Sequence, residues 1–565
     1  MTTSTKSPRI SLARMLGFLL KSHYLSDDFP NVLTTGNFAS FCVKNYKSLE
    51  TVKALLGRTT LYGTFSAPRT TTTRRVLALP HPTNQLAISL IIANERNRIR
   101  EVIESSKITL YKTSASAKAE RAFSGVDFRS RTKREAEILA KYPVVMTADI
   151  ANFFHTIYSH SLPWAVLGKQ HVKDVREGSD KIAQQELDKH WTSQIDVAIQ
   201  RGNSRETFGI PVGPDTSRII AEILLSGVHK NNSFAEMVKN REGYRLVDDF
   251  FIGFEDEASA RICQDALRRS LWEYNLHLNE TKTRIIHSST VFDGGWKYEV
   301  ENFQLDNSSR SKQRDGIQRL LEITLRHCEE RHDSQPAAFF CRRLLSLDIM
   351  FPNFPFVRDC FLRIARDFTV CLKFIAEFVT QYRDILADNE SLQVINHWAR
   401  QVLATHARRG HDLEIAWVLV ICGVLAIPVS QEFIGLKDRE VSPVVLAVLG
   451  LLSAEGLLAE SWDEWTTAPP GTGSVANGRN WLPNYEAVHR GWTTNAKIIK
   501  EIKGDPLFSR LLKAKVTFLD NSDFQSQVKA FAGPKLSRPS RRIRTGVVDR
   551  ARVRSARTTS IDKYD

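Results

Sequence analysis

The sequence predicts an α+β protein in which a first half of mixed strands and helices is followed by an all-α second half. The strand patterns lie mostly before about residue 290, whereas beyond about residue 312 amphipathic helical segments succeed one another with few strand signals. Hydrophobic residues make up 42% of the 565 residues and charged residues 25%, as in an ordinary folded protein. A chain of this length is expected to form about two to four domains.

The first elements mix helix and strand. The first sixty or so residues have a helical, mixed character. Residues 69–75 (RTTTTRR) are basic and β-branched and lead into the apolar run 76–79, which predicts a strand with cations at its start. Residues 84–105 have helical periodicity. A short buried strand is predicted over 144–150.

The remaining elements of the first half alternate in the same way. Residues 170–205 are polar and predict a helical excursion, after which the Gly- and Pro-rich turn 209–214 leads into a helix over 216–225. Residues 244–254 (YRLVDDFFIGF) predict two strands with an acidic turn between them. A helix is expected over 257–274.

The second half predicts a helical domain of stacked helix pairs, helical-repeat-like although no fixed repeat period is visible. The uncharged run 415–429 is shorter than the roughly 20 residues of a membrane span and indicates a buried core helix. Residues 466–480 predict a flexible loop. The expected helices cover 313–331, 336–348, 356–383, 391–408, 411–427 and 440–459.

The net charge of +15 suits a polyanionic partner, but it is unevenly spread. Residues 535–557 hold nine basic residues against one acid, Asp549. This tail has two interpretations: its arginines bind nucleic-acid phosphates, or it is a solvated, disordered segment. The nucleic-acid interpretation centres on Arg541, Arg542 and Arg544.

Seven cysteines without a CxxC pair argue against a disulfide framework and against a clustered zinc site. The N-terminal apolar patch is short and lacks a small-residue cleavage site, so secretion is not expected. These features predict a cytoplasmic protein with no membrane partner.

Acidic residues lie at the ends of predicted strands. Asp149 lies at the end of the strand over 144–150, and Asp248 and Asp249 form the acidic turn within 244–254. Separated carboxylates at strand ends can hold Mg²⁺, which prefers oxygen ligands and substrate phosphates. An Asp-Asp pair alone is usually a solvated turn, so the sequence segments around it must decide between a turn and a metal site.

Four sequence segments, which include these acids, resemble the palm motifs of the reverse transcriptases. They occur in the right order and within about 135 residues. The resemblance implies a right-hand polymerase with fingers, palm and thumb, joined to the α-helical domain. It also implies Mg²⁺ as cofactor, with Mn²⁺ able to substitute, and deoxynucleotides and nucleic acid as partners. The four segments are DIANFF (149–154), GIPVGPDTSR (209–218), VDD (247–249) and LNETKT (278–283).

Roles follow from the same resemblance. Asp149 and Asp248 would bind two Mg²⁺ ions with the Ile150 carbonyl, and Asp249 would support the site. Lys282 would act near the leaving pyrophosphate, or it is a surface lysine. The nucleotide-binding set would include Phe154, whose ring would exclude a 2′-hydroxyl unless it is ordinary core packing. The other members of that set are Phe153, Pro211, Gly213, Arg74 and Arg75, and the sequence does not decide which arginine grips the triphosphate.

Two segments resemble those of one branch of the family, the bacterial abortive-infection and defence-associated enzymes, which belong to the unknown-group reverse transcriptases. They are the continuation of the second motif through Arg218 and Glu222, and RVLALPHP (75–82). That branch implies a bacterial antiphage enzyme, commonly a homo-oligomer. It makes DNA without a template by protein priming, or on a partner noncoding RNA. Leu246 and Val212 depart from the common pattern and count against high-fidelity templated copying.

Two alternatives remain open: a conventional RNA-templated enzyme of the retron or intron kind, and a catalytically silent nucleic-acid-binding scaffold. The intact acids count against the scaffold, and the long helical half counts against a retron-like enzyme. The expected domains are an N-terminal helical extension (1–65), fingers and palm (66–310), a helical thumb and C-terminal domain (311–530) and a flexible basic tail (531–565).

Overall fold

The computed structural model describes most of the chain, and every structural statement below concerns the residues it describes. These are residues 10–21, 23–50, 57–70, 72–113, 123–124, 128–230, 232–291, 296–430, 441–458, 460–465 and 474–524.

The N-terminal region is helical, as predicted, and leads into a β-hairpin. The predicted strand begins at Arg74, and the hairpin is closed by the Arg69 N–H, which donates to the Thr73 carbonyl at 2.8 Å. The first strand of the hairpin was not predicted. In chain order the elements are α1 (Leu12–Leu20), α2 (Gly36–Glu50), β1 (Gly63–Pro68), β2 (Arg74–Leu79), α4 (Pro82–Asn94), α5 (Arg96–Glu104) and the short strands β3 (Lys112–Thr113) and β4 (Phe123–Ser124).

The palm is a four-stranded antiparallel sheet with the strand order β6-β7-β5-β8. The strand predicted near Asp149 is β5 (Val144–Ala148), and it pairs with β7 (Asp249–Phe254) and with β8 (Arg284–His287). The predicted acidic hairpin is formed by β6 (Gly243–Leu246) and β7, whose last pair is Leu246 with Asp249. The sheet therefore brings strands that are about 100 residues apart into direct contact.

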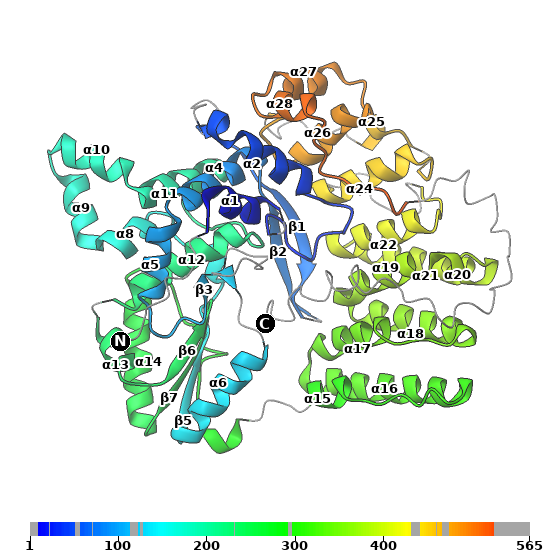
Figure 1. The fold of residues 1–565 in the computed structure, drawn as a ribbon, viewed down its shortest axis with the longest axis horizontal. Coiled ribbons are helices and arrows are strands. Elements are labelled where there is room, and N and C mark those ends of the chain that lie inside the picture. The colour runs from blue at the N-terminus through cyan, green and yellow to red at the C-terminus, as the bar shows by residue number, and fades with distance from the viewer. Residues whose placement is uncertain are drawn as a thin grey trace.

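Alternating side chains of these strands pack on opposite faces of the sheet. Met146 and Ile252 belong to the main core beside α14 (Glu257–Trp272), whereas Val145 and Phe251 pack beneath α6 (Phe128–Lys141). Figure 1 shows the palm strands with α6 beside them. The other helices of this half are α7 (Phe153–Thr156), α8 (Ser161–Leu167), α9 (Lys169–Glu177), α10 (Lys181–Lys189), α11 (Trp191–Gly202), α12 (Asp215–Val228) and α13 (Ser233–Val238).

The second half is helical, and Figure 1 shows α16 to α22 stacked on the side of the molecule away from the palm. One predicted helix, 356–383, is wrong: the chain leaves the helical conformation at Phe368, and a 3₁₀ turn separates α18 from α19. The helices are α15 (Trp296–Glu301), α16 (Arg310–Arg331), α17 (Gln335–Leu345), α18 (Phe354–Asp367), α19 (Leu372–Gln381), α20 (Arg383–Leu386), α21 (Asn389–Ala407), α22 (Asp412–Val424), α24 (Pro443–Ala454), α25 (Trp462–Trp465), α26 (Trp481–Arg490), α27 (Ala496–Gly504) and α28 (Phe508–Lys513).

Helix α22 anchors the second half to the fingers hairpin. Its side chains from Leu413 to Val424 are buried, as predicted for a core helix, and it packs against β1 as well as against its helical neighbours. Among the described helices, none combines the length and the apolar character needed to cross a membrane.

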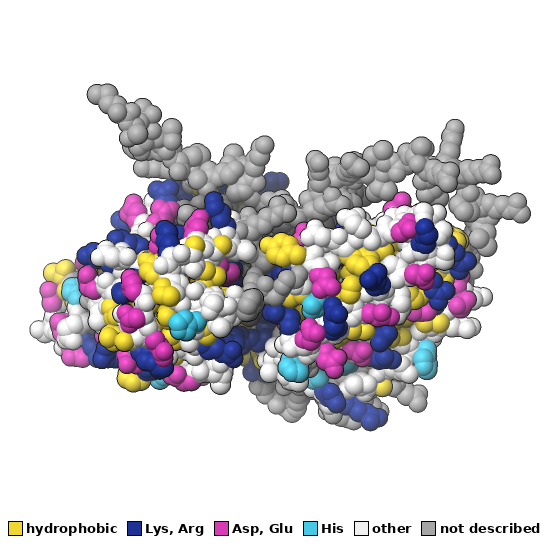
Figure 2. All heavy atoms as spheres, turned by 90° about the horizontal axis from the view of Figure 1, so that it is seen from below, with side chains coloured by type: hydrophobic (Ala, Val, Ile, Leu, Met, Phe, Trp, Pro, Cys, Tyr) yellow, Lys and Arg dark blue, Asp and Glu magenta, His cyan; other side chains and the backbone are white. Residues whose placement is uncertain are grey.

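A buried ionic contact joins the N-terminal region, the fingers and the helical half. The Asp28 carboxylate pairs with Arg75 and, at 3.3 Å, with Lys373, and the Asp28 carbonyl accepts the Trp417 indole N–H at 3.0 Å. Burial alone would raise the pKa of Asp28, but the charges of Lys373 and Arg75 outweigh it and lower the pKa to about 2. Elsewhere, basic and acidic side chains are interspersed over both lobes of the face seen in Figure 2.

Candidate active site

The three predicted acids meet at one end of the palm sheet. The last pair of β5 with β7 is Ala148 with Phe250, so one further step of the antiparallel register sets Asp149 opposite Asp249. Asp248 lies in the β6–β7 turn directly before Asp249. The strand ends therefore place the three acids close together, so that each of Asp248 and Asp249 is affected by the charge of Asp149.

The turn that carries Asp248 holds an unfavourable backbone conformation. Val247 has a φ of 54°, which is uncommon for a β-branched residue and costs about 1–2 kcal/mol. The Arg245 guanidinium donates to the Val247 carbonyl at 2.7 Å, and this hydrogen bond stabilises the turn.

Arg245 is in turn held by a buried ion pair. Its guanidinium makes two hydrogen bonds to the Glu222 carboxylate of α12, at 2.9 and 2.8 Å, and both side chains are only 1% exposed. The Thr109 hydroxyl also donates to Glu222, at 3.0 Å. Arg218, which shares a helical face with Glu222, forms a longer ion pair with Asp215, at 3.8 Å. Glu222 is noticeable in the sequence from its place in the second motif, whereas its partner Arg245 on β6 is not.

Asp149 is bonded to the fourth motif, which the chain brings back alongside it. The Asn279 amide donates to Asp149 Oδ2 at 2.9 Å, and Lys282 Nζ lies 3.2 Å from Oδ1. Ile150 and Leu278 form an isolated antiparallel bridge. Its hydrogen bonds are made by the residues on either side of this pair. Ile150 and Leu278 are the non-hydrogen-bonded pair of that bridge, so the Ile150 carbonyl points away from Leu278 and is a candidate metal ligand.

Burial and mutual repulsion dominate the electrostatics of the acids. Burial, and then the charge of Asp149, raises the pKa of Asp248 to about 6. Burial also raises the pKa of Asp249, reinforced by the charges of Asp248 and Asp149. Such a cluster of carboxylates is disfavoured unless cations neutralise it. Its oxygen-only donor set fits a hard divalent cation, with Asp149, Asp248 and the Ile150 carbonyl as ligands.

The predicted nucleotide-binding aromatics lie in different environments. Phe153 is 2% exposed and belongs to the core, whereas Phe154 is half-buried. The second motif packs directly on this segment, because the Ile210 N–H donates to the Phe154 carbonyl at 2.8 Å. Pro211 is half-buried in the same turn, and Gly213 has a φ of 127°, where a side chain would be strained.

The two predicted triphosphate arginines are both committed to carboxylates away from the acids. Arg74 donates to both oxygens of Glu414 at 2.8 Å, and Arg75 pairs with Asp28. A neighbouring arginine acts on the acids electrostatically: the charge of exposed Arg69, after that of Lys282, lowers the pKa of Asp248 against the larger effects of burial and of the Asp149 charge. Its signal in the sequence was its place at the head of RTTTTRR.

We expect Arg69→Ala to raise the KM for deoxynucleotides about 10- to 100-fold, because a charge-assisted contact contributes about 1.5–3 kcal/mol. Steady-state incorporation kinetics measure it. The control is Arg98→Ala, which removes an exposed guanidinium on α5 that pairs with Glu95 just before the helix. An unchanged KM in Arg69→Ala would remove this residue from nucleotide binding.

The basic residues Arg541, Arg542 and Arg544 lie outside the described residues, so their role stays a prediction.

An antiparallel sheet with three acids at one end, a fingers hairpin and a helical half define the class of the protein as a right-hand polymerase. Residues 97–314 match the family model described as "Reverse transcriptase (RNA-dependent DNA polymerase)". This part of the chain is therefore a reverse transcriptase domain, and the predicted enzyme class, an RNA-directed DNA polymerase, is confirmed.

Comparisons with other proteins add little to this. No curated protein matches the chain. Among solved structures, the chain is similar to apo telomerase from Candida tropicalis, with 12% identity, 64% of this chain and 68% of that chain covered, and a TM-score of 0.31. It is also similar to telomerase from Candida albicans in complex with a fragment of telomeric RNA, with 13% identity, 63% and 67% covered, and a TM-score of 0.26.

Proposed function

We propose that this protein is a Mg²⁺-dependent DNA polymerase of the defence-associated reverse transcriptases. It would make DNA from deoxynucleotides in antiphage defence, either without a template by protein priming or on a partner noncoding RNA, and would act as a homo-oligomer. The observation that carries the polymerase part is the convergence of Asp149, Asp248 and Asp249 beside Lys282. The defence part rests on the resemblance of the second motif, with Arg218 and Glu222.

Each group has a distinct task in this proposal. Divalent cations bound by Asp149 and Asp248 would stabilise the attacking and leaving oxygens of the phosphoryl transfer. Lys282, now 3.2 Å from Asp149, is free to turn toward the leaving pyrophosphate once a cation neutralises that carboxylate. The half-buried ring of Phe154 would lie under the incoming sugar and disfavour a 2′-hydroxyl.

The experiment that tests the proposal is an extension assay on the purified protein with Mg²⁺ and labelled deoxynucleotides, without added template or primer. A paired sample carries Asp248→Ala with Asp249→Ala. We expect label on the protein that resists ribonuclease and is absent from the variant. Label that requires an RNA supports the templated arm or the retron-like alternative. If neither condition gives incorporation that depends on the acids, while the protein still binds RNA, the proposal is overturned in favour of a scaffold.

A further inference from the structure

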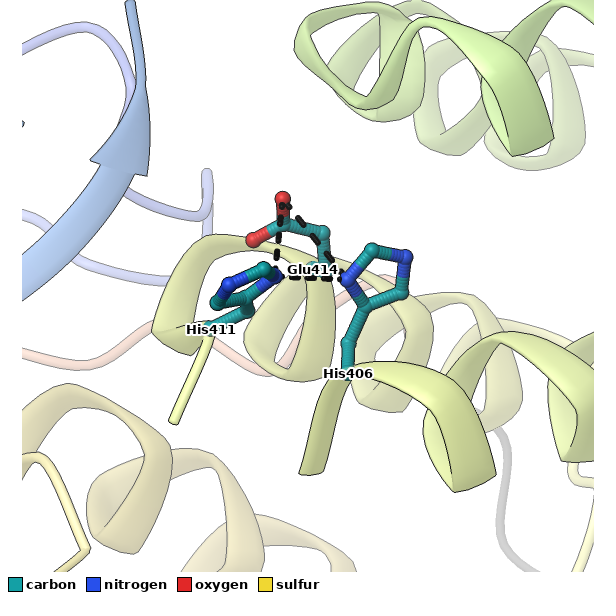
Figure 3. A group of neighbouring side chains, drawn as sticks. All are labelled: His406, His411 and Glu414. Atoms are coloured by element: carbon teal, nitrogen blue, oxygen red, sulfur yellow. Dashed lines mark hydrogen bonds and ion pairs between the residues drawn. The ribbon is translucent and has the colours of Figure 1, made fainter. Parts of the chain in front are cut away.

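A second group of ligand-type side chains lies in the helical half, at the corner between α21 and α22. His406 is in the last turn of α21, His411 immediately precedes α22, and Glu414 is in the first turn of α22. Figure 3 shows the two imidazoles and the carboxylate turned toward one another. Among the described residues, this is the one group of three such side chains whose ligand atoms all lie within 4.8 Å.

The backbone of the corner explains why the side chains converge. Gly410 has a φ of 65°, which lets the chain reverse within a few residues. The His411 N–H then donates to the His406 carbonyl at 3.2 Å. The two Nδ1 atoms come within 2.8 Å of each other, and each lies 4.0 Å from Glu414 Oε1.

We propose that His406, His411 and Glu414 bind a zinc ion. Two imidazole nitrogens and one carboxylate oxygen are a zinc donor set, with a fourth position left for water. Bond lengths of about 2.0–2.2 Å in a tetrahedron place ligand atoms roughly 3.3–3.5 Å apart. The imidazoles need to part and the carboxylate to approach by only about half an ångström, within the reach of side-chain rotation. The absence of CxxC pairs argues against a clustered zinc site, and this proposal revises that prediction because none of its ligands is a cysteine.

The site differs chemically from the one in the palm. The palm acids offer oxygen atoms alone, which suit Mg²⁺, whereas imidazole nitrogen favours zinc and other transition metals. Excess Mg²⁺ therefore occupies the palm without displacing zinc from the corner. Binding at the two places can be measured separately.

Zinc binding is linked to the fingers hairpin through Arg74. Both Glu414 oxygens accept from the Arg74 guanidinium at 2.8 Å, and Oε1 also accepts the Thr369 hydroxyl at 2.8 Å. An ion at Oε1 competes with these donors, so zinc and the Arg74 pair weaken each other reciprocally. The hairpin stays attached meanwhile, because the Ser66 N–H donates to Asp412 at 2.7 Å.

The test is zinc binding by the full chain in excess Mg²⁺, measured by competition with a chromophoric chelator. We expect about one zinc per chain, lost in both His406→Ala and His411→Ala. The control, His327→Ala, removes a histidine that also lies beside carboxylates, Glu299 and Glu330, and should leave binding unchanged. No zinc on the wild type, or equal zinc on His411→Ala, overturns the proposal.

A second variant distinguishes a zinc site from an ordinary structural corner. Arg74→Met removes the competing guanidinium, so zinc should bind about 10-fold more tightly and raise the thermal midpoint more than in the wild type. If the two histidines and Glu414 serve only to hold Arg74, Arg74→Met lowers the thermal midpoint of unfolding and zinc does not restore it. That result also overturns the proposal.

Discussion

Replacing Asp248 by Asn is expected to lower DNA synthesis about 1,000-fold or more, without loss of the fold. The substitution keeps the size of the side chain and removes the charge that would hold a divalent cation, which contributes several kcal/mol to the transition state. The pKa of Asp248 is raised to about 6, so its ionised form is disfavoured in the folded protein. Without a metal, the variant should therefore be more stable by on the order of 1 kcal/mol.

Incorporation rates and thermal midpoints in the presence of a chelator measure both effects. The matched control is Asp256→Asn, an exposed residue that caps α14 by accepting the Ser259 N–H at 2.8 Å. Asn serves as well as Asp at a helix N-cap, so neither measurement should move in the control. Synthesis within tenfold of the wild type in Asp248→Asn would exclude Asp248 as a metal ligand.

The placement of the three acids was predictable because it depends on short-range patterns. Each acid was expected at the end of an apolar strand, and β5 ends at Ala148 and β6 at Leu246, directly before these acids. Which strands pair with one another was not part of the prediction. The β6–β7 turn could also be placed from the sequence, since its two strands are adjacent in the chain.

The contacts that hold the site were not predictable, because they join residues far apart in the sequence. The sequence predicts that Arg74 and Arg75 are both available cations at the start of a strand. In the structure Arg74 pairs with Glu414, 340 residues away, and Arg75 pairs with Asp28. No local pattern distinguishes these arginines from Arg69. The single helix predicted over 356–383 failed for a related reason, since Thr369 at its break donates to Glu414.

The second large effect is expected from Glu222→Gln, which leaves the buried guanidinium of Arg245 without its counter-charge. Breaking a buried ion pair by removing one partner costs about 3–5 kcal/mol, so the thermal midpoint should fall markedly. The control is Glu257→Gln, which breaks the exposed Glu257–Arg261 pair on α14 and should cost less than about 0.5 kcal/mol. A similar midpoint in both variants would contradict a stabilising role for the buried pair.

A double variant separates stability from positioning of the catalytic turn. Glu222→Met with Arg245→Leu replaces the pair by apolar side chains, which is often neutral or stabilising, so the midpoint should recover. The Val247 carbonyl, however, loses the donor at 2.7 Å that holds it in the left-handed conformation. We therefore expect synthesis to stay low while stability returns, because Asp248 is no longer held beside Asp149. Recovery of synthesis together with stability would show instead that the pair acts on the fold alone.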